Sequence, residues 1–97
     1  MKHLTYQDLK KWQAEGRSLQ LIDVREREEH EAFNIGGQLI PLSEISKSKK
    51  LLQSDQPIVV YCKRGIRSQI AIQRWSAQLP KYDFYNLDAG VEALKRP

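Results

Sequence analysis

The chain has 97 residues, of which 40% are apolar and 29% charged, and its formal net charge is +4. These values are typical of a soluble globular protein with one hydrophobic core, so residues 1–97 are expected to form a single domain. The first twenty residues carry several charges and no apolar core segment, and no apolar run approaches membrane-spanning length, which argues against a signal peptide and against a membrane partner.

Helical and strand-like patterns alternate along the whole sequence. Thr5, with Asp8 three residues later, resembles a capping box, and Ser43 is placed to cap a later helix with a lysine-rich exposed face. The expected elements are, in chain order, a helix over residues 5–15, a strand over 19–24, a helix over 26–33, a strand over 39–40, a helix over 43–52, a strand over 58–61, a helix over 68–78, a strand over 84–87 and a helix over 90–94. Because strands separated by helices pair in parallel, we expect an α/β fold with an open parallel sheet of about four to five strands and helices on both faces.

The only cysteine, Cys62, lies where the apolar strand of residues 58–61 gives way to a turn and a helix. A strand that feeds directly into a helix leaves unpaired backbone N–H groups aimed into the turn, and these groups can cradle an anion. The residues that follow the cysteine are Lys63, Arg64, Gly65, Ile66, Arg67 and Ser68. The three cations among them favour a thiolate over a thiol, and the glycine permits a close or left-handed backbone. Cys62 is therefore a candidate nucleophile, and the alternative is a small buried hydrophobic residue.

Two further candidates follow the strand of residues 19–24. Ligands of an open parallel sheet collect beyond the carboxyl ends of its strands, where Asp23 and Arg25 also lie. We expect Asp23 to support the site by holding the loop or Arg25 through hydrogen bonds; the alternative is an ion pair on the surface. Arg67 is expected to bind two oxygens of an anion, and Ser68 is expected to cap the following helix.

Other residue types suggest no additional chemistry. His3 and His30 have no evident metal or triad partner in the sequence, and each is expected to be solvated or locally paired. The sequence contains no metal-ligand pattern, no dinucleotide fingerprint and no nucleic-acid-reading motif, so we expect no metal, no cofactor and no nucleic-acid partner. With a single cysteine an internal disulfide is excluded, which favours a reducing cytoplasm.

Several segments occur in an order that resembles the rhodanese-like sulfurtransferases. These segments are Cys62 to Ser68, Leu21-Ile22-Asp23-Val24-Arg25-Glu26 with Glu28-Glu29-His30, Asn34-Ile35-Gly36-Gly37, Ile40 to Ile45, and Asn86-Leu87-Asp88-Ala89-Gly90-Val91. The resemblance covers about residues 4–96. It departs at Asn34, where the family often has histidine, and at Ala89 and Leu94, where it often has glycine and tryptophan.

The resemblance implies a function for the loop. In this family a cysteine takes sulfur from a donor such as thiosulfate, holds it as a persulfide and passes it to a cyanide, thiol or carrier-protein acceptor. Carried over to this sequence, Cys62 is the nucleophile and residues 63–67 form the substrate-binding loop. Acidic residues are absent between Gln56 and Tyr82. That local positive charge favours a small anionic sulfur donor or an acidic protein partner, and a monomer is the default assembly.

Two other functions remain open at the level of sequence. Cysteine phosphatases share this fold but place one residue more between cysteine and arginine, whereas four residues separate Cys62 from Arg67. A binding or regulatory module that has kept the fold without the chemistry is the second alternative. Such modules usually lack the cysteine, and this chain retains it.

Overall fold

The computed structural model describes residues 1–95 and contains one sheet of five parallel strands. The strands are β1 (Lys2–Leu4), β2 (Gln20–Asp23), β3 (Gln38–Leu39), β4 (Ile58–Tyr61) and β5 (Phe84–Leu87). Their spatial order is β1-β5-β4-β2-β3, so the apolar strand that leads to Cys62 is the central one. The expected open parallel sheet is confirmed. Residues 96 and 97, which close the expected single domain, lie outside the described part.

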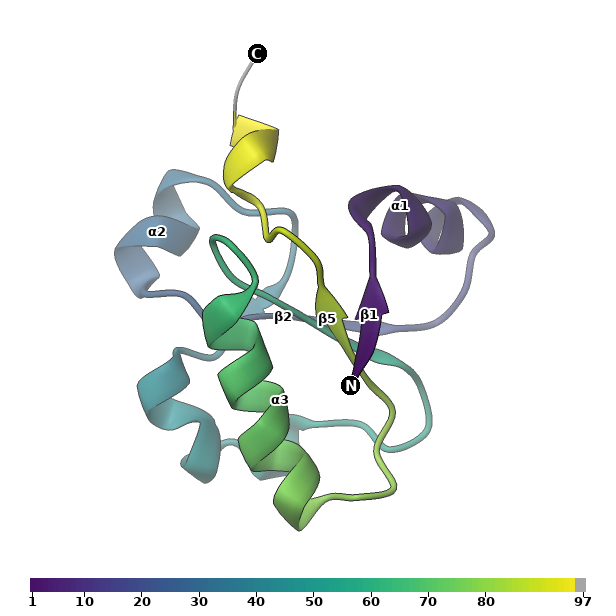
Figure 1. Ribbon diagram of the computed structural model, residues 1–97, viewed down its shortest axis with the longest axis vertical. Helices are drawn as coiled ribbons and strands as arrows, with labels where there is room; N and C mark the ends of the chain where they lie inside the picture. Colours follow the sequence, from purple (N-terminus) through teal and green to yellow (C-terminus); the bar gives the residue numbers. More distant parts are fainter. Residues whose placement is uncertain (96–97) are drawn as a thin grey trace.

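Helices cover both faces of this sheet. The α-helices are α1 (Tyr6–Ala14), α2 (Arg27–Ala32) and α3 (Ile66–Gln78), and three 3₁₀ segments are η1 (Leu42–Lys47), η2 (Lys49–Leu51) and η3 (Glu92–Lys95). Figure 1 shows α1 and α3 on opposite sides of β1 and β5. Within the described residues, no helix combines the length and the apolar character that crossing a bilayer requires.

The central strand separates two hydrophobic clusters because its side chains alternate between the two faces. Val60 and Cys62 belong to the cluster under α3 and η1, whereas Val59 and Tyr61 belong to the cluster under α1. All four side chains are at most 1% exposed. Strand burial on both faces explains why residues 58–61 are all aliphatic or aromatic, and the alternation of side chains puts Cys62 on the α3 side.

The segment after β3 differs from the expected helix over residues 43–52. It forms two short 3₁₀ segments that begin after Pro41, and Ser43 makes no capping bond. The carbonyl of Ile45 accepts a hydrogen bond from the indole N–H of Trp75 at 2.9 Å and another from the Ser48 amide at 3.2 Å. In a continuing α-helix the Ile45 carbonyl would accept a hydrogen bond from the Lys49 amide. Because Trp75 and Ser48 occupy this carbonyl instead, the segment forms the tighter 3₁₀ pattern and not an α-helix.

The last expected helix, over residues 90–94, is also shorter and of 3₁₀ type. The amides of Val91 and Glu92 donate to the Cys62 and Lys63 carbonyls at 3.1 Å instead of serving a helical turn. The turn after β5 therefore anchors the loop that follows β4. The first strand, β1, has no counterpart among the expected elements.

Candidate active site

Helix α3 begins two residues before the expected position because Gly65 occupies its N-cap in a left-handed conformation, with φ of 91°. The prediction that Ser68 caps this helix was wrong. Ser68 lies within the first turn, is completely buried, and donates its hydroxyl hydrogen bond to Oδ1 of Asn86. A left-handed glycine reverses the chain sharply enough for the helix to start directly after the loop. This early start carries Ser68 inward, against the sulfur.

The sulfur of Cys62 is surrounded by hydrogen-bond donors. The Gly65 amide donates to Sγ at 3.1 Å and the Ser68 amide at 3.4 Å, and the Ser68 hydroxyl oxygen lies 3.4 Å from the same atom. Cys62 itself is only 1% exposed. Amides aimed at a buried sulfur at the start of a helix favour a negative charge there, because they replace the water that burial removes. The expectation of loop amides directed at this sulfur agrees with the structure.

Backbone hydrogen bonds from the turn after β5 hold the loop that begins at Cys62. Val91 donates its amide to the Cys62 and Lys63 carbonyls, and Glu92 donates to the Lys63 carbonyl. Gly90, with φ of 61°, has no room for a side chain, since a Cβ atom would lie 2.5 Å from the Cys62 carbonyl oxygen and closer still to that of Lys63. The backbone of the loop is therefore fixed independently of its charged side chains.

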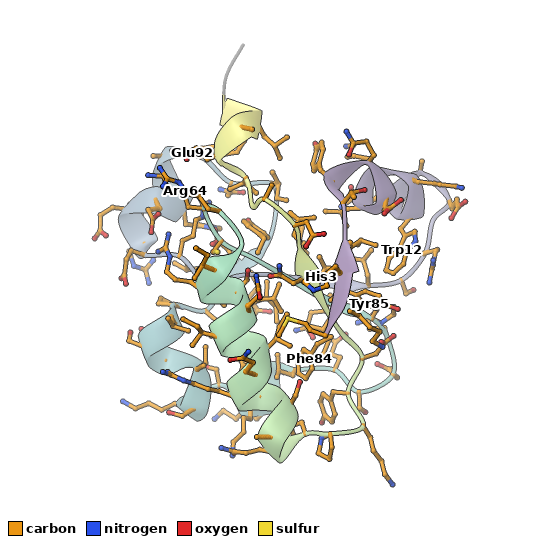
Figure 2. The ribbon with its side chains drawn as sticks, viewed as in Figure 1. His3, Trp12, Arg64, Phe84, Tyr85 and Glu92 are labelled. Atoms are coloured by element: carbon orange, nitrogen blue, oxygen red, sulfur yellow. The ribbon has the colours of Figure 1, made fainter. Side chains whose placement is uncertain are left out.

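All three cations of the loop are paired with carboxylates from other elements. Glu92 contacts Nζ of Lys63 at 3.3 Å and Nε of Arg64 at 2.9 Å. Figure 2 shows Arg64 and Glu92 next to each other at the C-terminal end of the fold. Arg67 instead binds both carboxylate oxygens of Glu29 from α2, at 2.7 and 2.9 Å. The exposed apolar residue of the loop is Ile66, which is 65% exposed.

These pairs shift the ionisation of their members. Hydrogen bonds from Arg67 lower the pKa of Glu29 from 4.5 to about 2, and the same pairing raises the pKa of Arg67. Arg64 and Lys63 hold the pKa of Glu92 below its usual value. Neither glutamate was assigned a role from the sequence, because nothing local connects α2 or the residues after β5 with the loop. For Glu29 the available signals are the four glutamates among residues 26–31 and its place in a segment that resembles the rhodanese-like family.

Asp23 and Arg25 form a buried group beside α2. The Asp23 carboxylate accepts hydrogen bonds from the backbone N–H and Nε of Arg25 at 2.9 Å and from its Nη2 at 2.8 Å. Nδ1 of His30 lies 2.9 Å from the same carboxylate, so the expected local pairing of this histidine is confirmed. Burial opposes ionisation of Asp23, yet the hydrogen bonds from Arg25 and His30 keep its pKa below the usual value.

The alternative of a surface ion pair for Asp23 is ruled out, because Asp23 is 0% and Arg25 2% exposed. Arg25 also donates to the Phe33 carbonyl at 2.5 Å, which ties the end of β2 to the end of α2. The pair therefore positions the helix that carries Glu29. In the described structure the Asp23 carboxylate bonds to Arg25 and His30, not to a loop residue.

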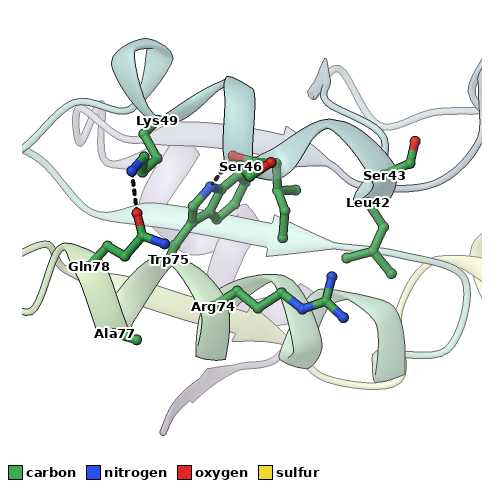
Figure 3. Close-up of a pocket in the computed structure, with 9 residues that line it drawn as sticks. Leu42, Ser43, Ser46, Lys49, Arg74, Trp75, Ala77 and Gln78 are labelled. Atoms are coloured by element: carbon green, nitrogen blue, oxygen red, sulfur yellow. Dashed lines mark hydrogen bonds between the residues drawn. The ribbon is translucent and has the colours of Figure 1, made fainter.

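A separate apolar groove of about 350 Å³ lies between η1 and α3 (Figure 3). Its walls include Leu42, Trp75 and the stem of Lys49, and Lys49 is hydrogen-bonded to Gln78 across one end. None of its lining residues belongs to the Cys62 loop. Over residues 1–95, no group of His, Cys, Asp and Glu side chains is arranged to hold a metal ion.

A cysteine at the carboxyl end of the central parallel strand, with the amides of the next loop aimed at its sulfur, places the chain among the α/β proteins with an open parallel sheet and a cysteine loop at the sheet edge. The rhodanese-like domain model matches residues 5–97, and the chain belongs to that family. A rhodanese-like domain protein from Staphylococcus aureus superposes with a TM-score of 0.85 at 26% identity, covering 96% of this chain and 90% of that one.

Two curated relatives extend the comparison. YqhL of Bacillus subtilis, described as uncharacterized, is 40% identical over 93 residues, which is 95% of this chain and 71% of that protein. MoeZ of Mycobacterium tuberculosis, named a probable adenylyltransferase/sulfurtransferase, is 43% identical over 72 residues. That match covers 71% of this chain but only 18% of MoeZ, so it concerns one segment of a much longer protein.

Proposed function

We propose that this chain is a sulfurtransferase that carries sulfane sulfur as a persulfide on Cys62. The observation that carries the proposal is the convergence of the Gly65 and Ser68 amides on a 1% exposed sulfur, at 3.1 and 3.4 Å. These donors suit a thiolate at Sγ before the transfer, and in the persulfide the negative charge would pass to the outer sulfur, within the same loop of backbone amides. Family membership and the sulfurtransferase named in the MoeZ relative support the same chemistry.

The proposed reaction has two steps. The Cys62 thiolate attacks the outer sulfur of thiosulfate, the bond between the two donor sulfurs breaks, and sulfite leaves with the electron pair. The loop amides stabilise the persulfide anion that remains on Cys62. In the second step a cyanide, a thiol or a carrier-protein nucleophile attacks the outer sulfur of the persulfide and regenerates the thiolate. The electrons balance within these two displacements, so the proposal needs no separate oxidant.

The roles of the neighbouring residues follow from their positions. Gly65 and Ser68 hold the sulfur, and Lys63, Arg64 and Ile66 form the exposed rim over which a donor or an acceptor would approach. We further propose that residues 1–97 work as one domain in the reducing cytoplasm, where a single thiol stays free. An acidic carrier protein as acceptor fits the positive residues of this rim.

Thiosulfate-dependent formation of thiocyanate from cyanide tests the proposal. The native chain should turn over, and Cys62→Ser should be inactive while keeping the native thermal midpoint. Turnover retained in Cys62→Ser would remove the nucleophile assignment. Hydrolysis of an aryl phosphate faster than sulfur transfer would favour the phosphatase, and a folded native chain inert in both assays would favour the binding module.

A further inference from the structure

Arg67 is already occupied by an anion of the protein itself. Both oxygens of the Glu29 carboxylate bind its guanidinium, at 2.7 and 2.9 Å, in the paired geometry that a sulfonate or sulfite group would adopt. The two side chains are 31% and 30% exposed, so an anion from solvent can reach this ion pair. The expectation that Arg67 is free to bind two donor oxygens therefore needs revision.

Glu29 is held in place by its own helix as well. Its Oε1 atom accepts a hydrogen bond from the Glu26 amide at 2.9 Å, which closes the N-terminal turn of α2. Burial of the Asp23–Arg25 pair fixes the strand end from which α2 starts. These contacts hold the Glu29 side chain in one conformation, opposite Arg67. The carboxylate is ionised throughout the neutral range because its pKa is about 2.

We propose that Glu29 is a specificity-determining residue that selects against doubly charged sulfur donors by competing with them for Arg67. This inference rests on the proposed sulfurtransferase function. A dianion such as thiosulfate must displace the carboxylate and then lie beside it, with two like charges sharing one guanidinium. A donor whose leaving end bears no full charge reaches the sulfur without that exchange.

Two donors that deliver the same sulfur separate these cases. With thiosulfate, the Cys62 thiolate takes the outer sulfur and sulfite leaves as a dianion. With benzenethiosulfonate, the thiolate takes the terminal sulfur, the bond between the two sulfurs breaks, and benzenesulfinate leaves as a monoanion with the electron pair. The persulfide on Cys62 is identical in both reactions, so a difference between the donors reports on how the leaving end is bound.

The test compares Glu29→Gln with the matched control Glu28→Gln. Glutamine keeps a carbonyl oxygen for the Glu26 amide, and Glu28 lies on the same short helix, is exposed and has no ion-pair partner among the described contacts. Relative to this control, Glu29→Gln should lower the thiosulfate KM about tenfold, the equivalent of one lost charged contact, and the benzenethiosulfonate KM less than about threefold. The kcat values should change less than the thiosulfate KM.

A double-mutant cycle makes the result specific to Arg67. In an Arg67→Gln background the Glu29→Gln change should lower the thiosulfate KM much less than tenfold, since the guanidinium for which the two anions compete is gone and only the repulsion between carboxylate and dianion remains. The inference would be overturned if Glu29→Gln and the control Glu28→Gln had equal thiosulfate KM values, or if Glu29→Gln changed the KM of both donors equally. Either result would leave persulfide formation on Cys62 intact. If neither donor formed a persulfide on Cys62 of the native chain, the proposed sulfurtransferase function would instead be overturned.

Discussion

Replacing Gly90 by alanine tests how firmly the Cys62 loop is held by the turn after β5. Gly90 adopts φ of 61°, which costs an alanine about 1–2 kcal/mol. The added Cβ would also stand 2.5 Å from the Cys62 carbonyl oxygen and against the Lys63 carbonyl, both backbone atoms that cannot turn aside. Displacing them costs about 1–3 kcal/mol more and weakens their bonds to the amides that follow Gly90. Together these two costs predict a loss of about 2–5 kcal/mol in the free energy of unfolding.

Gly16→Ala is the matched control, because Gly16 has φ of 74° but no neighbouring atom within 4 Å of the point where an alanine Cβ would lie. It should lose only the conformational cost of about 1–2 kcal/mol. Urea unfolding of both variants gives the comparison, and sulfur transfer should fall in Gly90→Ala alone, since only that change moves the carbonyls of the loop. Equal losses in the free energy of unfolding for the two variants would show that the loop carbonyls are not packed closely against Gly90.

Three further changes probe other parts of the structure. Asp23→Asn should destabilise by about 3–5 kcal/mol in urea unfolding, because it leaves the Arg25 guanidinium buried without a countercharge; an unchanged midpoint and activity would contradict the supporting role. Ionised Glu29 contributes its full stabilisation above about pH 4.5 and loses it as the pH falls toward its pKa of about 2. Glu29→Gln should therefore reduce by about 1 kcal/mol the free energy of unfolding that the native chain loses between these pH values. Equal losses in the native chain and the variant would refute this. Tyr61→Phe removes the hydroxyl that accepts from the Gly37 amide at 3.3 Å and should cost about 1–2 kcal/mol, whereas a neutral result would mean that water replaces it.

Elements with local signals were predicted well from the sequence. The Thr5 hydroxyl accepts from the Asp8 amide at 3.0 Å and the Asp8 carboxylate accepts from the Thr5 amide at 3.3 Å, as the capping box requires. The apolar run of residues 58–61 is the buried central strand, and it delivers Cys62 to the carboxyl edge of the sheet. These features depend on neighbours in sequence, which is why a single chain reveals them.

Features that depend on distant partners were missed. The strand β1 has only three residues and is defined by its pairing with β5, where Lys2 aligns with Tyr85 at the other end of the chain. Ser68 carries an ordinary helix-cap signal, but the left-handed Gly65 starts the helix earlier and turns Ser68 inward. The pairing of β1 with β5 has no signal in the residues near β1. The left-handed conformation of Gly65 has none strong enough to outweigh the cap pattern at Ser68.

The cations of the loop show the same limit for the site. Sequence order indicated a positive field around Cys62, whereas folding brings Glu29 to Arg67 and Glu92 to Arg64. Counting charges along one segment therefore overestimated the field that a donor meets. The amide cradle was the more dependable expectation, since a strand, a glycine turn and a helix start fix backbone directions within a few residues.

Mass spectrometry of the reduced protein after incubation with thiosulfate tests the central claim most directly. We predict the mass of one added sulfur atom, located on the peptide that contains Cys62 and removed again by cyanide. A folded protein whose Cys62 stays an unmodified thiol under these conditions would contradict the persulfide mechanism.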